Sequence, residues 1–389
     1  MRIIIVTGKG GVGKTSIAAA TALRAARSGL RTLVMSTDSA HSLSDCFEVQ
    51  LGPEPVAIEQ GLYGQEVDAR TELVKNWGHI RQFINTALQA RGVDGIVAEE
   101  LSVFPGMEEL FSLFLVRKYF EQAAYDLVIL DCAPTDSTIR LLSLPDVLNW
   151  YLKKIFPIQR TVARIARPIV KRTLDVNLPG EGVFEDIRGF VTALDGIRDI
   201  LTDPGITTVR LVVNLEKMVI RETQRTYTCM NLFGYLVDAV FVNRILPEEM
   251  GAGYMEGWKA IQSGYMARVR ESFAAARIFQ SRLFEREMVG LERLQEFGEQ
   301  LFGQVDPARV FSDSRPMTLA RQEDGYRLTW RIPGVDRDGI DLWTKGDELI
   351  LKTPSHMRNM VLPSVLVGRR ITDALFQEGT LTITFGAGS

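Results

Sequence analysis

Short apolar runs alternate with longer stretches of helical periodicity over about the first 250 residues of the chain. Four of these runs read as buried strands, at 2–6, 32–35, 127–130 and 209–213. The first run leads into a predicted helix over 14–27. Strands joined by helices in this way are typical of a parallel sheet with helices on both faces. The pattern therefore predicts an α/β fold with a doubly wound, mainly parallel sheet.

Two further regions show helical periodicity alone. The first, at about 140–205, is rich in Leu, Ile, Val and Arg and is interrupted by Pro157, Pro168 and Pro179. We predict a helical insertion within the α/β domain there. The second, over about 255–302, carries charged residues on one side and apolar residues on the other. We predict that it is helical and packs back onto the sheet.

The pattern changes again near residue 316. Turn-forming residues separate short alternating runs that read as strands, at 326–330, 340–344, 349–352 and 381–385. We therefore predict a small all-β sandwich domain over 316–389, which follows a larger domain over 1–306.

Composition and charge exclude several classes of protein. The chain has 389 residues, 46% of them hydrophobic, and carries 45 Lys and Arg against 48 Asp and Glu, a formal net charge of −3. This balance gives no reason to expect nucleic acid as a partner. No apolar run approaches the roughly 20 residues of a membrane span, and the run at residues 3–6 is too short for a signal peptide. We therefore expect a soluble, cytoplasmic protein.

The three cysteines, Cys46, Cys132 and Cys229, stand far apart in the sequence. An odd number at this spacing rules out a disulfide framework and any C-x-x-C metal or redox pair. We interpret them as buried or partly buried thiols. His41 and His79 have no paired carboxylate motif beside them, and we interpret both as structural or surface residues.

A glycine-rich motif follows the first predicted strand and opens the first predicted helix. It reads Gly-Lys-Gly-Gly-Val-Gly-Lys-Thr and fits G-x-x-x-x-G-K-[ST], the phosphate loop of P-loop NTPases. The glycines let backbone N–H groups surround a phosphate, Lys14 meets the β- and γ-phosphates, and Thr15 holds Mg²⁺. A glycine-rich turn without a ligand is the alternative, and the position between strand and helix argues against it. We predict ATP and Mg²⁺ as cofactors, with these binding candidates: Gly8, Lys9, Gly10, Gly11, Val12, Gly13, Lys14, Thr15 and Ser16.

Two acidic loops follow other predicted strands of the same sheet. Asp38 comes after the strand at 32–35, and Asp131 comes after the strand at 127–130. Ligands in such sheets lie at the carboxyl ends of the strands, so both loops belong with the phosphate loop. Asp131 suits the outer shell of Mg²⁺, through water, and Asp38 is the best candidate to orient or deprotonate the attacking water. A helix N-cap or turn former is the alternative for each.

Several motifs in order resemble the arsenite-pump and tail-anchored-protein-targeting ATPase family over about residues 1–303. They are the phosphate loop with its additional Lys9, the loop Thr37–Asp45, the segment Asp131–Pro145 and the segment Pro105–Glu109. The resemblance implies a homodimeric ATPase whose nucleotide sites face each other, with Lys9 reaching the partner's ATP and Asp38 activating water. By the same resemblance Asn243 reads adenine, and Arg282, which replaces a proline of the family, stacks on the base.

The chain departs from this family in its cysteines. The eukaryotic targeting factors share a zinc ion through a C-x-x-C pair, and the arsenite pumps bind metalloid through clustered cysteines; the chain has neither. We therefore predict a dimer without zinc and regard an arsenite- or anion-transporting role as the weakest alternative. Cys132, Asp136 and Ser137 also stand where the family has Thr, Gly and His, which leaves the coupling between nucleotide and client open.

The predicted insertion contains a basic amphipathic stretch at 150–173, in which apolar residues alternate with Lys and Arg and no acid occurs. Such a stretch suits packing on the domain, a groove for an apolar helix, or an anionic membrane surface. The related targeting ATPases use this region as a groove for a transmembrane segment. The resemblance therefore favours hydrophobic or tail-anchored client proteins, released in step with ATP hydrolysis and with transient membrane contact. The rival hypothesis is a chaperone-like protein that is stabilised by ATP and binds clients constitutively.

The strand pattern after residue 316 resembles the α-crystallin domain of small heat-shock proteins. The resemblance is carried by the segments Tyr326–Val335, Gly346–Leu351, Leu362–Pro363 and Ala374–Ile383. A client-binding surface and a rigid brace for the dimer remain equal alternatives for this domain.

Overall fold

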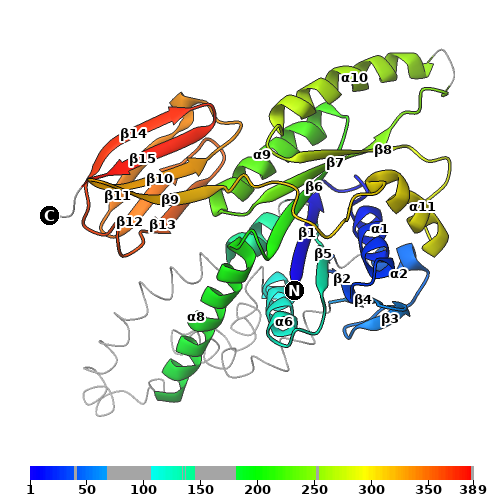
Figure 1. Cartoon of the computed structure of the whole chain (residues 1–389), viewed down its shortest axis with the longest axis horizontal. Coiled ribbons are helices and arrows are strands. Elements are labelled where there is room, and N and C mark those ends of the chain that lie inside the picture. The colour runs from blue at the N-terminus through cyan, green and yellow to red at the C-terminus, as the bar shows by residue number, and fades with distance from the viewer. Residues whose placement is uncertain are drawn as a thin grey trace, which may run out of the picture. The chain divides into compact units, whose positions relative to one another are not determined.

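The computed structural model of the chain describes residues 1–38, 42–67, 107–133, 135, 137–144, 181–250 and 254–386 (Figure 1). These residues divide into two compact units. The first comprises Met1–Glu66, Tyr125–Ile139 and Leu201–Ser389, and the second comprises Val67–Ala124 and Arg140–Ile200. The basic stretch at 150–173, His41 and His79 lie outside the described residues.

An eight-stranded sheet forms the centre of the first unit, with the strand order β3-β4-β2-β5-β1-β6-β7-β8. The strands are β1 Arg2–Gly8, β2 Thr32–Ser36, β3 Val56–Glu59, β4 Leu62–Glu66, β5 Leu127–Asp131, β6 Thr207–Asn214, β7 Val237–Ile245 and β8 Arg277–Arg282. Every neighbouring pair is parallel except β3 and β4. The predicted α/β class with a mainly parallel sheet is confirmed.

Burial explains why the central strands read as continuous apolar runs. Ile3 to Val6 in β1 and Leu127 to Leu130 in β5 are inaccessible to solvent, because both faces of a parallel strand are covered. Helix α1 (Lys14–Arg27) packs closely because much of its buried side is alanine. Its bounds are those that the sequence predicted.

Four further α-helices of the first unit each follow a strand in sequence. They are α2 Ser42–Phe47, α9 Lys217–Phe233, α10 Tyr254–Ser272 and α11 Leu291–Phe302. In the second unit, α6 spans Met107–Glu121, and α8 spans Glu181–Thr202, of which Leu201 and Thr202 belong to the first unit. No helix within the described ranges is both long enough and apolar enough to cross a membrane.

The prediction of a helical stretch over about 255–302 was wrong in its middle. Between α10 and α11 the chain forms β8, which pairs in parallel with β7 at the edge of the sheet. Only Phe279 and Ser281 of this strand are fully buried, and arginines begin and end it. An edge strand with so few buried residues has a weak apolar signal, and the helical periodicity of the segments on either side of it masked that signal.

The C-terminal region consists of two antiparallel sheets, β14-β15-β10-β9 and β11-β12-β13. Their strands are β9 Met317–Gln322, β10 Gly325–Arg331, β11 Asp341–Lys345, β12 Glu348–Lys352, β13 Met357–Val361, β14 Ile371–Gln377 and β15 Thr380–Phe385. The four predicted strands correspond to β10, β11, β12 and β15, whereas β9, β13 and β14 were not predicted. The expected all-β domain is confirmed as a fold.

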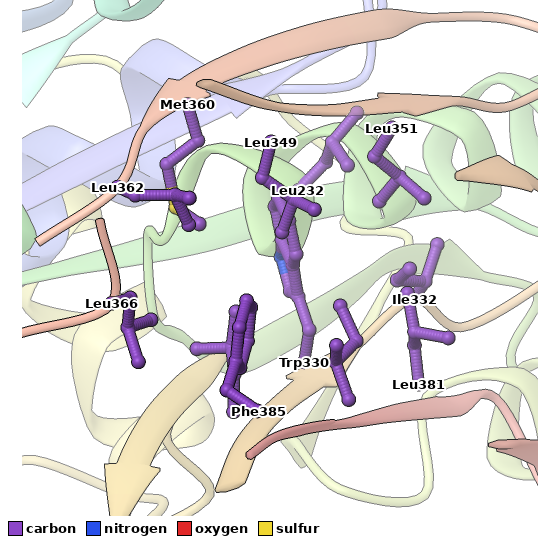
Figure 2. Close-up of a cluster of buried hydrophobic side chains, with 12 residues drawn as sticks. Leu232, Trp330, Ile332, Leu349, Leu351, Met360, Leu362, Leu366, Leu381 and Phe385 are labelled. Atoms are coloured by element: carbon purple, nitrogen blue, oxygen red, sulfur yellow. The ribbon is translucent and has the colours of Figure 1, made fainter. Parts of the chain in front are cut away.

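A cluster of buried side chains lies between these two sheets, and it includes Trp330, Leu349, Leu381 and Phe385 (Figure 2). Leu232, from the last turn of α9, belongs to the same cluster. The core of the C-terminal region is therefore completed by a side chain from a helix of the α/β region.

Candidate active site

The predicted site residues come together at the carboxyl ends of the strands of the large sheet. Gly8 ends β1, Lys9 to Gly13 form the turn, and α1 begins with Lys14, Thr15 and Ser16. Asp38 follows β2, Asp131 ends β5, Asn243 lies in β7, and Arg282 ends β8.

Two glycines of the loop have no room for a side chain. A Cβ on Gly8 would clash with the carbonyl oxygen of Val212 in β6, and a Cβ on Gly13 would clash with the amide of Asn243. Gly13 also has a φ of +97°, in the left-handed region that favours glycine. The loop can therefore present its backbone N–H groups, and the N-terminus of α1, to an anion.

The two lysines of the loop have different partners. Lys14, which is buried, donates from Nζ to the backbone oxygen of Lys9 at 3.3 Å. The Nζ of Lys9 lies 3.6 Å from Oε2 of Glu222 in α9. Lys14 thus stays over its own loop, whereas the side chain of Lys9 extends toward a helix outside it.

Thr15 and Asp131 supply oxygen atoms suited to a magnesium ion. The Thr15 hydroxyl lies 3.2 Å from the Ser42 hydroxyl, at the start of α2. Asp131 is almost completely buried, and neither of its carboxylate oxygens has a hydrogen-bond partner among the described residues. Burial raises the pKa of Asp131 to about 7, and the neighbouring Thr15 hydroxyl, followed by the Lys14 ammonium, opposes that rise. A buried carboxylate without partners beside a hydroxyl fits a hard cation that keeps part of its water shell.

The loop that carries Asp38 is tied to the loop that follows β5. The backbone N–H of Thr37 donates to the carbonyl of Asp131 at 3.0 Å, and the Thr37 hydroxyl accepts from the N–H of Ala133 at 3.4 Å. The N–H of Asp38 donates to the Ser36 hydroxyl at 3.2 Å. The position of Asp38 therefore depends on the strand that ends in Asp131.

A cavity of about 560 Å³ adjoins the phosphate loop, and Gly13, Thr15, Ser16, Asn243 and Arg282 are among the residues that line it. Its size suits the base and sugar of a nucleotide. The Asn243 amide nitrogen donates to the carbonyl of Val12 at 2.8 Å, and its oxygen accepts from the N–H of Arg244 at 2.9 Å. Asn243 therefore braces the phosphate loop from the wall of this cavity.

Arg282 lies on the same cavity wall, with its guanidinium carbon 5.7 Å from the ring centre of Phe284. The cavity is closed on one side by the segment after β8. That segment is held to α2, since Gly290 N–H donates to the carbonyl of Cys46 at 3.0 Å and the Cys46 thiol contacts the Met288 carbonyl at 3.6 Å. The structure thus brings Arg282 to the cavity where the base was expected.

Sequence reasoning did not single out Thr37, Ser42 or Thr138 as parts of this site, or Glu222, which contacts Lys9 from outside the site. Thr138 accepts from the Thr7 hydroxyl at 2.9 Å and donates to the Ala133 carbonyl at 2.8 Å, which links β1 to the loop after β5. Two of these residues, Thr37 and Ser42, lie within the motif that carried the resemblance. Nothing in the local sequence marks Glu222 or Thr138.

All three cysteines are described and buried, and they lie in α2, after β5 and in α9. Burial raises the pKa of each thiol to about 12, so that they stay protonated at neutral pH. Within the described part of the chain, no group of three or more His, Cys, Asp or Glu residues could hold a metal ion.

Two protein-family models match the chain over most of its length. Residues 1–303 match the model of the anion-transporting ATPases, and residues 323–385 match the model of the HSP20-like domain found in ArsA. A "Putative arsenical pump-driving ATPase" of Chlorobaculum tepidum is 40% identical over 388 residues, which cover 99% of this chain and 96% of that protein. "ATPase ASNA1 homolog 1" of Paramecium tetraurelia is 26% identical over 307 residues, 77% of this chain and 92% of its own. Both resemblances read from the sequence are confirmed.

Proposed function

This chain belongs to the anion-transporting ATPase family and is an ATPase, and we propose that it works as a Mg²⁺-dependent homodimer that binds and releases hydrophobic protein segments in step with ATP hydrolysis. The observation that carries the proposal is the position of Lys9. Its ammonium lies beside α9 and not over its own phosphate loop, where Lys14 lies. A lysine placed in this way can serve the nucleotide of a second subunit, as the family resemblance implies.

Hydrolysis in this proposal depends on residues at one edge of the sheet. Lys14 and the N-terminus of α1 bind the phosphates, and the Thr15 hydroxyl and Asp131 hold Mg²⁺, Asp131 through water. Mg²⁺, when bound, neutralises charge that develops on the transferred phosphoryl group. Asp38 orients the attacking water and accepts its proton. The hydrogen bonds of Thr37 to Asp131 and Ala133 keep Asp38 in register with the metal site.

The client is proposed from the sequence and the family. The basic amphipathic stretch at 150–173 combines apolar and cationic side chains, which suits an apolar helix that leaves or approaches a membrane. The HSP20-like match adds a second candidate surface on the same chain. We place the protein in the cytoplasm, with ATP and Mg²⁺ as cofactors and no zinc in the dimer.

The test is client release. A peptide with an apolar transmembrane sequence and a photo-crosslinking group is bound to the protein, and release is followed with ATP and with a non-hydrolysable analogue. The proposal expects rapid release with ATP and retention with the analogue. Equal release in both would favour the rival hypothesis, in which ATP only stabilises a protein that binds clients constitutively.

An arsenical-pump role is the other candidate, because relatives bear that name. The cysteine positions argue against metalloid binding, since the three thiols are buried and lie on separate elements. Addition of arsenite should therefore leave the ATPase rate unchanged. Stimulation by arsenite would instead support the pump role.

A further inference from the structure

Lys9 has an acidic partner within its own subunit. The Lys9 Nζ and Glu222 Oε2 atoms are 3.6 Å apart, and the two side chains are 35% and 32% exposed. Glu222 lies in the second turn of α9, which follows β6 in the sequence. The pair therefore links the tip of the phosphate loop to an element that has no other part in the proposed chemistry.

Helix α9 is anchored at both ends, so it cannot follow Lys9. At its start, Glu216 N–H donates to the carbonyl of Asn214 at the end of β6, at 2.8 Å. At its end, the backbone oxygen of Asn231 accepts from Trp330 Nε1 at 3.2 Å, and that of Leu232 accepts from Arg358. A movement of Lys9 away from the phosphate loop therefore breaks its contact with Glu222.

We propose that Glu222 is a positioning residue that holds Lys9 within its own subunit until a triphosphate in the opposite site attracts it. This inference rests on the proposed homodimer. A lysine ammonium is a compact, mobile charge, and a triphosphate presents more negative oxygens than one carboxylate. Glu222 thus competes with the partner's nucleotide for Lys9. The competition raises the protein concentration that is needed for dimer assembly. It leaves the turnover number of the assembled dimer unchanged.

Removal of the carboxylate tests this role. In Glu222→Gln, the protein concentration that gives half-maximal specific ATPase activity should fall about two- to tenfold, because two surface ion pairs per dimer no longer have to break. The turnover number at saturating protein and ATP should stay at the wild-type value. Sedimentation with a non-hydrolysable ATP analogue should show the same shift toward dimer.

Two controls separate this effect from a general change of charge. Glu216→Gln removes the same charge six residues earlier, at the N-cap of α9, where the described residues form no ion pair with it, and it should behave as the wild type. In a Lys9→Ala background, Glu222→Gln should have no further effect, because the group that Glu222 holds is gone.

Three results would overturn the assignment. An unchanged or higher half-maximal concentration in Glu222→Gln would show that the carboxylate does not restrain Lys9. A lower turnover number at saturation would show that Glu222 acts in the assembled site. A wild-type chain that stays monomeric with the analogue, with activity independent of protein concentration, would overturn the homodimer itself and this role with it.

Discussion

Trp330 in strand β10 donates its indole N–H to the backbone oxygen of Asn231, in the last turn of α9, at 3.2 Å. The carbonyls of a last helical turn lack partners within the helix. Arg358 in β13 donates to the next carbonyl, that of Leu232, and its guanidinium lies 5.4 Å from the Trp330 ring centre. The β-sandwich thus caps a helix of the ATPase region with two buried side chains, one of them a cation at the negative end of the helix.

Because of this cap, removal of the C-terminal domain should lower the stability and the solubility of the remaining chain. Truncation before Met317, which removes residues 317–389, takes away the residues that cover Leu232, which is inaccessible in the full chain. We expect a folded ATPase that still dimerises but has a lower melting temperature and a stronger tendency to aggregate. Differential scanning calorimetry and light scattering measure both.

A matched variant distinguishes aggregation that is caused by the exposed Leu232 side chain from misfolding of the truncated chain. Leu232→Ser in the truncated chain should restore solubility, because it removes the uncovered apolar side chain. If the truncated chain is insoluble with either residue, the region before Met317 does not fold independently. If the isolated fragment 316–389 slows aggregation of an unfolded test protein, the domain is a client surface as well as a brace.

A second buried contact fixes the segment that leads into the C-terminal domain. Asp238 in β7 lies 3.5 Å from Nε of Arg210 in β6, both are inaccessible to solvent, and Asp238 accepts from the Phe311 N–H at 3.2 Å. Asp238→Asn leaves a buried guanidinium uncompensated. We expect it to lower the free energy of unfolding by about 3–5 kcal/mol, measured by urea denaturation.

The exposed pair of Arg31 and Asp126 provides the control. Solvent screens this pair, so Asp126→Asn should change the midpoint of denaturation far less. In the double variant Asp238→Asn with Arg210→Met, much of the lost stability should return, because the fully buried guanidinium is gone and the remaining neighbour of Asp238, Arg2 at 3.9 Å, keeps part of its side chain exposed to solvent. No recovery in the double variant would mean that the hydrogen bond to Phe311 carries most of the stability.

The sequence predicted the bounds of an element best where a motif fixes the local backbone geometry. Helix α1 begins at Lys14, directly after the phosphate loop, and ends at Arg27 before Ser28-Gly29, so both ends carry a signal. Strand β8 lacks such a signal, because its residues are largely exposed at the sheet edge. Contacts such as Asn243 with Val12 join positions more than 200 residues apart. Only the folded sheet brings such positions together, which is why the bracing role of Asn243 was not foreseen.

Asp38 can be tested separately from nucleotide binding. Asp38→Asn should keep ATP binding but lose at least about tenfold in turnover, because a neutral amide accepts no proton and orients water less well. Lys14→Ala should instead weaken nucleotide binding, measured with a fluorescent ATP analogue. Turnover near the wild-type value in Asp38→Asn would remove Asp38 from the proposed mechanism.

The basic stretch at 150–173 can be tested without reference to its fold. Reversal of charge at Arg160, Arg164 and Arg167 together should impair association with client peptide or anionic vesicles and leave basal ATPase activity nearly intact. Vesicle flotation and peptide crosslinking measure the association. Loss of ATPase activity with normal client binding would place these arginines in the catalytic core.

The trans role of Lys9 makes a prediction for mixed dimers. Each proposed site uses Asp38 of one subunit and Lys9 of the other, so Lys9→Ala and Asp38→Asn homodimers should each have two impaired sites. A mixed dimer has one site with both groups intact and one site with neither. Equal mixing with free subunit exchange should therefore restore about a quarter of wild-type activity, since half the dimers are mixed and each has one working site. If Lys9 acts within its own subunit, both sites of a mixed dimer carry one defect and mixing restores nothing.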